Sequence, residues 1–373
     1  MKIAFTGGGT GGHFYPIIAV AEAIHDIVVE EKMINPKLYF ISPTPYDQKM
    51  LFDYGIIYKK VSTGKLRRYF SILNLFDFFR TGIGVLKALW TLFTIYPDII
   101  FSKGGYGSFP VVLAGKILGI PIIIHESDST PGKVNIWAGK FAKKIAVSYP
   151  EAAEHFPKEK VAWTGNPVRK KIKFVSNEGA AEYLNLESTI PTILILGGSQ
   201  GSKIINDAIF EALPVLLEKY QIIHQVGVKN IKGILELKNT LLKDHQYIRR
   251  YKPYKYLNDL AMKMAAGAAD VVISRAGSTI FEIANWHKPS IIIPITKSND
   301  NHQLKNAYIY ARTGAASVIE EKNIFDDILL IEIDRILNNE EIKNKMIEET
   351  KSFAKPEAAN LIAKEIIKIS NNH

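Results

Sequence analysis

Cysteine is absent from this chain of 373 residues. Without thiols, the protein can form no disulfide, and it has neither a thiolate metal ligand nor a cysteine nucleophile. This composition agrees with a reducing compartment. We also expect no secretory signal, because only a few apolar residues follow Lys2 before a glycine-rich stretch begins.

Three further features are missing from the sequence. No run of about 18 uncharged apolar residues occurs, so we expect no segment to span a membrane. The chain lacks the G-x-x-x-x-G-K-[ST] motif, which argues against a P-loop kinase or ATPase. No acid-rich metal-binding motif stands out, so we expect no metal site.

Positive charge, in contrast, is in excess. The formal net charge is +10, and 47% of the residues are hydrophobic. The length suits two domains, each with a sizeable core. The basic surplus predicts an anionic partner, which could be a nucleic acid, a nucleotide substrate or an acidic membrane surface.

The stretch from Thr6 to His13 consists mostly of glycine. It follows an apolar strand expected at residues 2–5 and precedes an apolar segment with helical spacing, which we expect to open at Pro16. Glycines between a strand and a helix let the backbone approach a ligand closely, and the free N–H groups at the helix start attract phosphate. The alternative is a turn whose glycines only allow the helix to pack on the strand.

A dinucleotide site of the dehydrogenase type is disfavoured. Such a site needs an acidic residue at the end of the second strand, where it binds a ribose. We expect that strand at residues 37–42, and no carboxylate closes it.

The strand, glycine turn and helix recur along the chain. Further glycine turns occur at residues 103–108 and 197–202, each directly after an apolar strand. Residues 269–294 repeat the order of residues 97–125: a strand ending in serine, a basic residue, a glycine turn, a helix, a proline and a strand with three isoleucines. The repeat predicts two α/β halves, each with a doubly wound parallel sheet.

We therefore place one Rossmann-like domain at residues 1–165 and a second at residues 166–350. The two sheets are expected to face each other across a cleft, with their glycine turns at the carboxyl edges of the strands. Residues 351–373 are expected to form an amphipathic helix that packs back on the body.

Residues 65–96 combine large apolar side chains with interspersed basic ones. A helix that is apolar nearly all round is usually buried in a core. Alternatively, such a segment lies on an anionic membrane, with apolar side chains in the lipid and cations at the headgroups. Both interpretations hold if one face of the helix packs in the core while an exposed part of the segment contacts the lipid.

Seven motifs together resemble those of the MurG family, in order and over nearly the whole chain. They are GGTGGH at residues 8–13, GGY at 104–106, HESD at 125–128, TGNPVR at 164–169, GGSQG at 197–201, SRAG at 274–277 and HQLKNA at 302–307. The resemblance implies the GT-B fold, in which two Rossmann-like domains face each other across a cleft. It also implies that neither a metal nor another cofactor takes part.

The resemblance implies an inverting glycosyltransferase of peptidoglycan synthesis. Such an enzyme moves N-acetylglucosamine from UDP-N-acetylglucosamine to the C4 hydroxyl of undecaprenyl-pyrophosphoryl-MurNAc-pentapeptide, which converts lipid I to lipid II. The implied partners are these two substrates, an anionic membrane surface and other proteins of cell-wall synthesis and division, but no nucleic acid. The protein would be peripheral at the cytoplasmic face of the bacterial cell membrane and would serve cell shape and the cell cycle.

The resemblance also assigns residues. The implied donor-binding residues are Thr10, Gly11, Gly12, Asp128, Arg169, Ser199, Leu257, Glu282 and Gln303. Among them, Arg169 and Ser199 would hold phosphate, and Glu282 the ribose hydroxyls. The backbone at Leu257 would contact the uracil, and Asp128 and Gln303 would bind sugar hydroxyls. Tyr106 and His125 would orient the acceptor or its pyrophosphate.

The chemistry itself needs a base and an anion site. The acceptor hydroxyl must lose a proton as it attacks the anomeric carbon, and the departing UDP must be stabilised. His13 is our first candidate for the base, because a helix N-terminus disfavours its cation and keeps the imidazole neutral. Glu126, at the end of a strand, is the rival base. Backbone amides, helix dipoles and Arg169 would stabilise the UDP.

Two other functions stay open at this point. One is a different GT-B sugar-nucleotide enzyme, such as an epimerase or another lipid-linked transferase. The other is a basic protein that binds nucleic acid or membrane without catalysis. Dispersed basic residues and the lack of a recognised nucleic-acid module disfavour this second alternative.

Overall fold

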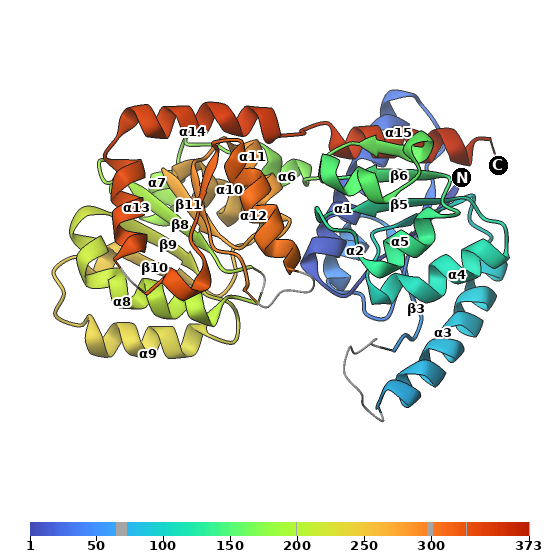
Figure 1. Ribbon diagram of the computed structural model, residues 1–373, viewed down its shortest axis with the longest axis horizontal. Coiled ribbons are helices and arrows are strands. Elements are labelled where there is room, and N and C mark those ends of the chain that lie inside the picture. The colour runs from blue at the N-terminus through green and yellow to red at the C-terminus, as the bar shows by residue number, and fades with distance from the viewer. Residues whose placement is uncertain (65–72, 199, 297–300, 326, 373) are drawn as a thin grey trace. The chain divides into compact units, whose positions relative to one another are not determined.

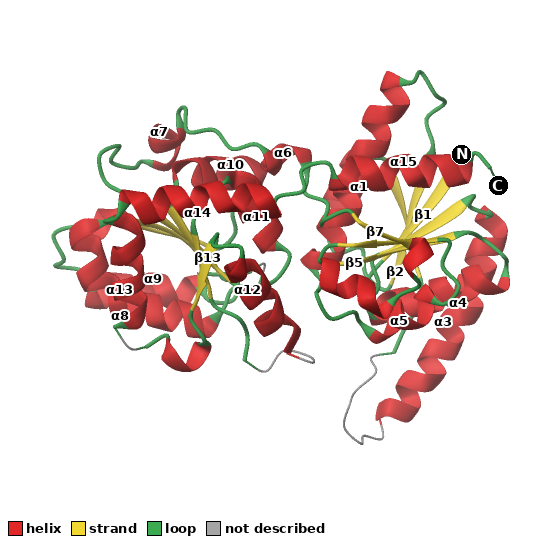
Figure 2. Cartoon of the chain, turned by 45° about the horizontal axis from the view of Figure 1, so that its top comes forward, coloured by secondary structure: helices red, strands yellow, loops and turns green. Residues whose placement is uncertain are grey.

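The computed structural model describes the chain except for residues 65–72, 199, 297–300, 326 and 373. The chain forms two compact units. Unit 1 comprises Met1–Arg169 and Lys355–His373, and unit 2 comprises Lys170–Ala354. Each unit is a parallel sheet between layers of helices, as Figure 2 shows by the strands enclosed among helices in each half.

Unit 1 has a seven-stranded sheet in the order β3-β2-β1-β4-β5-β6-β7. Its strands are β1 (Lys2–Thr6), β2 (Lys37–Ser42), β3 (Ile56–Lys60), β4 (Ile99–Ser102), β5 (Ile122–Glu126), β6 (Lys144–Val147) and β7 (Val161–Trp163). Its α-helices are α1 (Gly11–Glu30), α2 (Gln48–Asp53), α3 (Leu73–Ile95), α4 (Phe109–Ile117), α5 (Lys133–Gly139) and α15 (Ala358–Ser370). Figure 1 shows their arrangement.

The central strands of this sheet are buried on both faces, which is why they are continuous apolar runs. Successive side chains alternate between two cores: Ile3 and Phe5 of β1 belong to the core with α1 and α15, whereas Ala4 belongs to the core with α3 and α4. Helix α15 packs on α1. The C-terminal segment thereby closes one face of unit 1.

Unit 2 has a six-stranded sheet in the order β10-β9-β8-β11-β12-β13. Its strands are β8 (Thr192–Leu196), β9 (Gln221–Gln225), β10 (Tyr251–Tyr254), β11 (Val271–Ser274), β12 (Ser290–Ile292) and β13 (Ala316–Val318). Its α-helices are α6 (Lys170–Lys173), α7 (Ala180–Leu184), α8 (Lys203–Lys219), α9 (Ile231–Leu241), α10 (Asp259–Ala268), α11 (Thr279–Trp286), α12 (His302–Arg312), α13 (Ile328–Leu337) and α14 (Glu340–Phe353).

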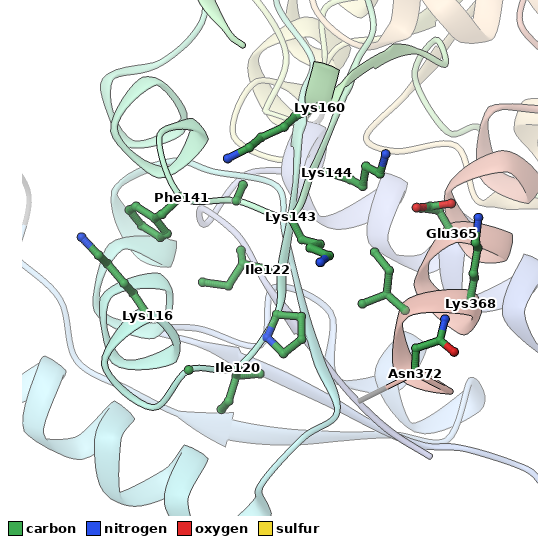
Figure 3. A pocket seen from close by; sticks show the side chains of 14 residues that line it. Lys116, Ile120, Ile122, Phe141, Lys143, Lys144, Lys160, Glu365, Lys368 and Asn372 are labelled. Atoms are coloured by element: carbon green, nitrogen blue, oxygen red, sulfur yellow. The ribbon is translucent and has the colours of Figure 1, made fainter. Parts of the chain in front are cut away.

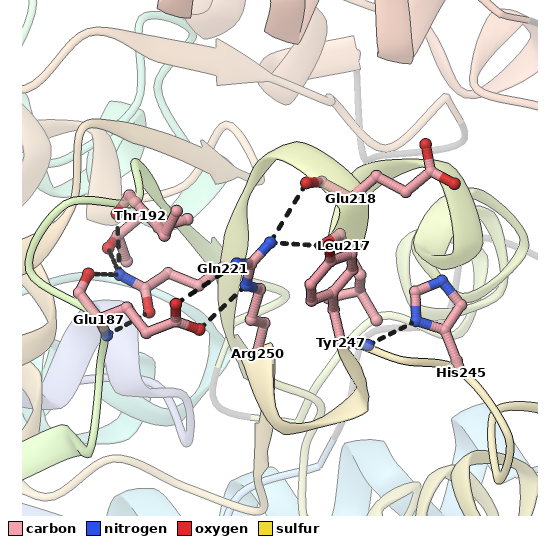
Figure 4. Close-up of polar contacts among 9 residues, drawn as sticks. Glu187, Thr192, Leu217, Glu218, Gln221, His245, Tyr247 and Arg250 are labelled. Atoms are coloured by element: carbon pink, nitrogen blue, oxygen red, sulfur yellow. Dashed lines mark hydrogen bonds and ion pairs between the residues drawn. The ribbon is translucent and has the colours of Figure 1, made fainter.

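Polar contacts fasten the start of β9 to the chain that precedes β8 (Figure 4). The side-chain amide of Gln221 donates to the carbonyls of Glu187 and Ile190, both at 2.8 Å. Arg250 forms an ion pair with Glu187, with Nε 3.0 Å from Oε1, and donates to the carbonyl of Leu217 at 3.1 Å. These bonds lie at the amino edge of the sheet and leave its carboxyl edge available for ligands.

The two doubly wound parallel sheets predicted from the sequence are confirmed. The internal repeat is confirmed as well, because β4 lies between β1 and β5 as β11 lies between β8 and β12. The placement of one sheet opposite the other and the domain limits at residues 165 and 350 stay predictions.

The predicted start of the first helix is wrong. Helix α1 begins at Gly11, and the carbonyl of Thr10 accepts from the N–H groups of His13 and Phe14, both at 3.1 Å. Pro16 therefore lies inside the helix, where it removes one N–H donor while the apolar side chains around it stay buried. The consequence is that Gly11, Gly12 and His13 form the first turn.

Helix α1 is the one described helix that is long and apolar enough to cross a membrane, but 61% of that window is buried in the protein, as in the core helix of a soluble protein.

Candidate functional site at the carboxyl edges of the two sheets

In unit 1, three strands end side by side below the glycine turns. Thr6 at the end of β1 pairs with Ser102 at the end of β4, and β4 pairs with β5, which ends at Glu126. The glycine turn before α1, the turn after Ser102 and the loop after Glu126 therefore start at the same edge of the sheet. In an open α/β sheet this is the edge where ligands bind.

The first two of these turns touch through glycines. Gly104 and Gly105 have φ angles of 75° and 77°, which side chains other than hydrogen rarely allow. A Cβ atom on Gly105 would lie 3.1 Å from Nε2 of His13 and 3.2 Å from Cα of Gly8. The glycines thus let the second turn pack directly against the imidazole at the start of α1.

His13 lies where the two turns meet, because Cβ atoms on Gly8 and Gly105 would both come within 3.1 Å of its ring nitrogens. Its Nδ1 lies 2.7 Å from Oγ1 of Thr10, the residue that precedes α1. Burial and, to a smaller extent, the positive charge of Lys103 lower the pKa of His13 to about 4, while Asp128 acts in the opposite direction. This agrees with the neutral imidazole expected from the sequence, although burial and not the helix terminus is the main cause.

Glu126 is buried and fully engaged with N–H donors. One carboxylate oxygen accepts from the backbone of Asp128 at 3.0 Å. The other accepts from the backbone of Gly132 at 3.0 Å and from the amide of Asn135 at 2.8 Å. Burial and the neighbouring Asp128 raise the pKa of Glu126, while these bonds oppose the shift. The carboxylate therefore shapes the loop that carries Asp128.

Tyr106 and His125 differ in their exposure to solvent. Tyr106 is 38% exposed, and a Cβ atom on Gly9 would lie 3.8 Å from its hydroxyl, so it borders the first glycine turn. His125 is 0% exposed, with Nε2 3.0 Å from the carbonyl of Gly165 and Nδ1 2.5 Å from Nζ of Lys103. Because both ring nitrogens are engaged, His125 can influence an acceptor only through its neighbours.

Arg169, far along the chain, comes to the same end of α1. Its guanidinium carbon lies 4.2 Å from the centre of the Tyr15 ring, and Tyr15 belongs to α1. Gly11 packs against Tyr15 and Tyr46, because a Cβ atom on Gly11 would lie 2.8 Å from the hydroxyl of Tyr46 and 3.0 Å from the ring of Tyr15. Thr10 is exposed and Gly12 is half-buried. The described unit 1 residues singled out from the sequence thus gather around one helix start.

In unit 2, the remaining donor candidates also lie at the carboxyl edge. Glu282 is in the first turn of α11, and Gln303 is in the first turn of α12, where its Oε1 accepts from the N–H of Ile295 at 3.2 Å. Leu257 is buried, and its N–H donates to Oε1 of Gln225 at 2.9 Å. Ser199 lies outside the described residues.

Sequence reasoning did not single out two cations, of which one is buried and the other largely buried. Lys103 follows β4, and Arg275 follows β11 at the equivalent place. Arg275 donates to Oγ of Ser202 at 2.5 Å and to the carbonyl of Ile293 at 3.0 Å, and its guanidinium lies 2.7 Å from Glu321. The signal that could have found them is a lone basic residue between an apolar strand and a glycine turn, present in both halves of the repeat.

Metal-ligating clusters and cavities are the other features of the described residues that could mark a site. Within the described ranges, no group of three or more His, Asp or Glu side chains could hold a metal ion. A cavity of about 910 Å³ opens at the amino edge of the unit 1 sheet. Figure 3 shows the lysines that line it: Lys116, Lys143, Lys144, Lys160 and Lys368. It lies at the other end of β5 from Glu126.

Family models match both halves of the chain. The glycosyltransferase family 28 N-terminal domain matches residues 3–147, and the C-terminal domain of the same family matches residues 192–362. A relative from Bacillus thuringiensis, named UDP-N-acetylglucosamine--N-acetylmuramyl-(pentapeptide) pyrophosphoryl-undecaprenol N-acetylglucosamine transferase 3, is 38% identical and covers 92% of this chain and 93% of its own.

The chain belongs to the MurG family of glycosyltransferases. A relative from Treponema denticola with the same transferase name is 34% identical over 97% of this chain and 96% of its own length. Among solved structures, Acinetobacter baumannii MurG has a TM-score of 0.72 with 24% identity, over 98% of this chain and 99% of that one. A UDP-GlcNAc 2-epimerase from Neisseria meningitidis has a TM-score of 0.66 with 13% identity, over 99% of this chain and 100% of that one. Both solved structures share the fold of this chain.

Proposed function

We propose that the protein transfers N-acetylglucosamine from UDP-N-acetylglucosamine to the C4 hydroxyl of the muramyl sugar of lipid I, which yields lipid II. The names of relatives with 34–38% identity over most of the chain support this assignment. The structural observation that carries it is His13, a neutral imidazole in the first turn of α1 between two glycine turns.

In this proposal His13 is the general base. Nδ1 of His13 lies 2.7 Å from Oγ1 of Thr10, and we propose that it donates its proton there. In this tautomer the lone pair of Nε2 accepts the proton of the acceptor hydroxyl. The hydroxyl oxygen then forms a bond to the anomeric carbon. The bond from that carbon to the phosphate oxygen breaks, and UDP departs with the electron pair. Proton acceptance of this kind contributes roughly 10²–10⁴-fold to a rate.

The departing pyrophosphate needs positive potential, which the start of α1 can provide. Its first turn is made of Gly11, Gly12 and His13, so the two glycines add no side chain of their own beside their N–H groups. Arg169, held against Tyr15, adds a charge that stays positive at all ordinary pH values. In unit 2, Glu282 and Gln303 are proposed to hold the ribose and sugar hydroxyls.

Glu126 takes a supporting place in this scheme. Both of its oxygens already accept N–H bonds from its own loop, so we assign it the task of holding Asp128 in position rather than accepting the proton. Asp128 is proposed to bind a hydroxyl of the transferred sugar.

Helix α3 is the proposed membrane contact. One face of it packs in the core through Ala88 and Leu92, against the layer that contains α4. Along the opposite face lies a row of exposed side chains at intervals of three and four residues: Phe79 at 62%, Ile83 at 61%, Leu86 at 68%, Trp90 at 70% and Phe93 at 64%. Such a stripe, with exposed Arg80 and Lys87 beside it, suits an interfacial helix on anionic lipid.

A panel of donors and acceptors tests the reaction. Purified protein is incubated with UDP-N-acetylglucosamine or other UDP- and GDP-sugars, and with a short-chain lipid I analogue or other lipid-linked sugars. The proposal expects a lipid-linked disaccharide only from the first member of each set. Conversion of the sugar nucleotide to its C2 epimer without an acceptor would instead assign the chain to the epimerase reaction.

A further inference from the structure

A lysine is buried at the centre of the unit 1 site. Lys103 follows β4 directly, and its N–H donates to the carbonyl of Thr6 at 2.9 Å, so it continues the pairing with β1. Its side chain is only 2% exposed. A Cβ atom on Gly7 would lie 3.4 Å from the Cβ atoms of both Lys103 and His13, so these two side chains flank the same glycine.

The ammonium of Lys103 meets one acceptor for each of its three protons. Nζ lies 2.5 Å from Nδ1 of His125, 2.5 Å from Oγ of Ser127 and 3.4 Å from Oδ1 of Asn166. These acceptors belong to the end of β5, the loop after it and the turn after β7. One cation therefore joins three segments that are distant in sequence.

These contacts also determine the tautomer of His125. The carbonyl of Gly165 can only accept, so the ring proton of His125 is on Nε2, and Nδ1 accepts from the Lys103 ammonium. That proton points to the carbonyl of Gly165 at 3.0 Å. Gly165 begins the segment that ends at Arg169, so the orientation of His125 fixes the path of the chain toward the proposed phosphate-binding arginine.

We propose that Lys103 is a positioning residue of the transfer reaction, which ties the loops after β4, β5 and β7 together and supplies the positive charge beside His13. This inference rests on the proposed function for its catalytic meaning. Its structural content, the tautomer of His125 and the charge next to His13, can be measured without any turnover.

Lys103 is surrounded by charged and titratable groups, through which it affects the pKa of His13. His13 of α1, His125 of β5, and Glu126 and Asp128 of the following loop are the groups that act on it or respond to it. Burial lowers the pKa of Lys103 to about 7, and the carboxylates of Glu126 and Asp128 oppose that shift. The cation in turn disfavours protonation of His13 and of His125.

The first test uses the unaltered protein with ¹⁵N-labelled histidine and lysine. Nitrogen chemical shifts should show that His125 carries its ring proton on Nε2 and not on Nδ1. The Lys103 ammonium should give a signal protected from solvent exchange below pH 7. A proton on Nδ1 of His125, or the absence of a protected ammonium, would overturn the proposal whatever the activity of the protein.

The second test compares Lys103→Met with Lys116→Met, which removes an exposed lysine of α4. The Lys103 variant should raise the pKa of His13 by about one unit, because a positive neighbour is lost while burial remains. At pH 5 its kcat/KM should then fall roughly twofold more than at pH 8, since less His13 is neutral. Lys116→Met should change neither quantity. An unaltered His13 titration in a folded Lys103→Met protein would refute the electrostatic part of the proposal, and transfer activity absent from the unaltered protein would refute only the proposed reaction.

Discussion

The two units place a cation after the equivalent strand, but they pair it differently. Lys103 after β4 forms hydrogen bonds with a histidine, a hydroxyl and an amide, none of which is a carboxylate. Arg275 after β11 lies 2.7 Å from the carboxylate of Glu321. An arginine paired with a carboxylate stays charged at all ordinary pH values, whereas an unpaired buried lysine titrates more easily.

This difference suggests a division of tasks between similar scaffolds. The carboxyl edge of unit 1 holds His13, Lys103, His125 and Glu126, four buried or partly buried groups whose pKa values are shifted from their ordinary values. Such clusters of shifted groups are typical of proton transfer. At the corresponding edge of unit 2, Arg275 and Glu321 form a fixed pair that fastens the turn before α8. We infer that unit 1 carries the proton chemistry and unit 2 the fixed donor site.

The largest effect is expected from His13→Ala, which tests the proton chemistry assigned to unit 1. Removal of the proposed base should lower kcat by roughly 10²–10⁴-fold while the affinity for UDP-N-acetylglucosamine changes little. Transfer to a lipid I analogue measures the first quantity, and calorimetric titration measures the second. The control is His155→Ala, which removes an exposed histidine of the same unit. A rate within tenfold of the unaltered protein would mean that another group takes the proton.

The second prediction concerns the ion pair between Arg275 and Glu321 in unit 2. Arg275→Ala leaves the largely buried Glu321 without its partner, so the free energy of unfolding should fall by about 3 kcal/mol. Arg335→Ala breaks a more exposed pair with Glu332 and should cost about 0.5 kcal/mol. Urea denaturation followed by circular dichroism compares the two variants. Equal losses would show that Arg275 and Glu321 contribute no more than a surface pair.

The third prediction separates the two faces of α3. Replacing Phe79 and Trp90 by serine should weaken binding to vesicles with anionic lipid by about tenfold without unfolding the protein, since both side chains are exposed. Sedimentation with vesicles measures the binding, and the melting temperature checks the fold. The matched control is Leu92→Ser on the buried face, which should unfold the protein instead. Vesicle binding unchanged by the double replacement would remove α3 from the membrane contact.

The smallest expected effect is a pH dependence within unit 2. Burial lowers the pKa of His224 to about 3, and its ring contacts Asn206 and Tyr251, each at 3.1 Å. Because the pKa of His224 is lower in the folded than in the unfolded protein, its contribution to the free energy of unfolding is fully present above pH 6.5. This contribution is lost as the pH falls toward 3. Below pH 6, the free energy of unfolding should therefore fall by about 1 kcal/mol per pH unit.

Hydrogen exchange of the β9 amides can follow this loss. His224→Gln should flatten the slope between pH 6 and pH 4, because a glutamine cannot take up the proton. A slope as steep as that of the unaltered protein would assign the acid sensitivity to other groups.

The sequence was most informative for the sheets. Strands at the centre of a parallel sheet are continuous apolar runs, and residues 37–42 were expected as a strand and form β2. Pro16 predicts a helix start at its own position, whereas the carbonyl of Thr10 already accepts from His13 and Phe14, so α1 begins at Gly11. Local propensity alone could not place this boundary.

The polar network around Lys103 was beyond the reach of sequence patterns. Its three acceptors lie 22, 24 and 63 positions away along the chain, and only the folded sheet brings them together. The burial of His125 had the same origin, because Gly165 covers its ring from the turn after β7. Motif resemblance pointed to His125 but gave no account of how this residue contacts Lys103 and Gly165.

The most direct test of the central claim is the structure of the product from a single turnover. Protein in excess over ¹³C-labelled UDP-N-acetylglucosamine is mixed with a lipid I analogue, and the product is examined by NMR. Our account predicts one equivalent of UDP and a β-linked N-acetylglucosamine on the C4 oxygen of the muramyl sugar. An α-linked product, or free sugar released while the acceptor stays unchanged, would contradict it.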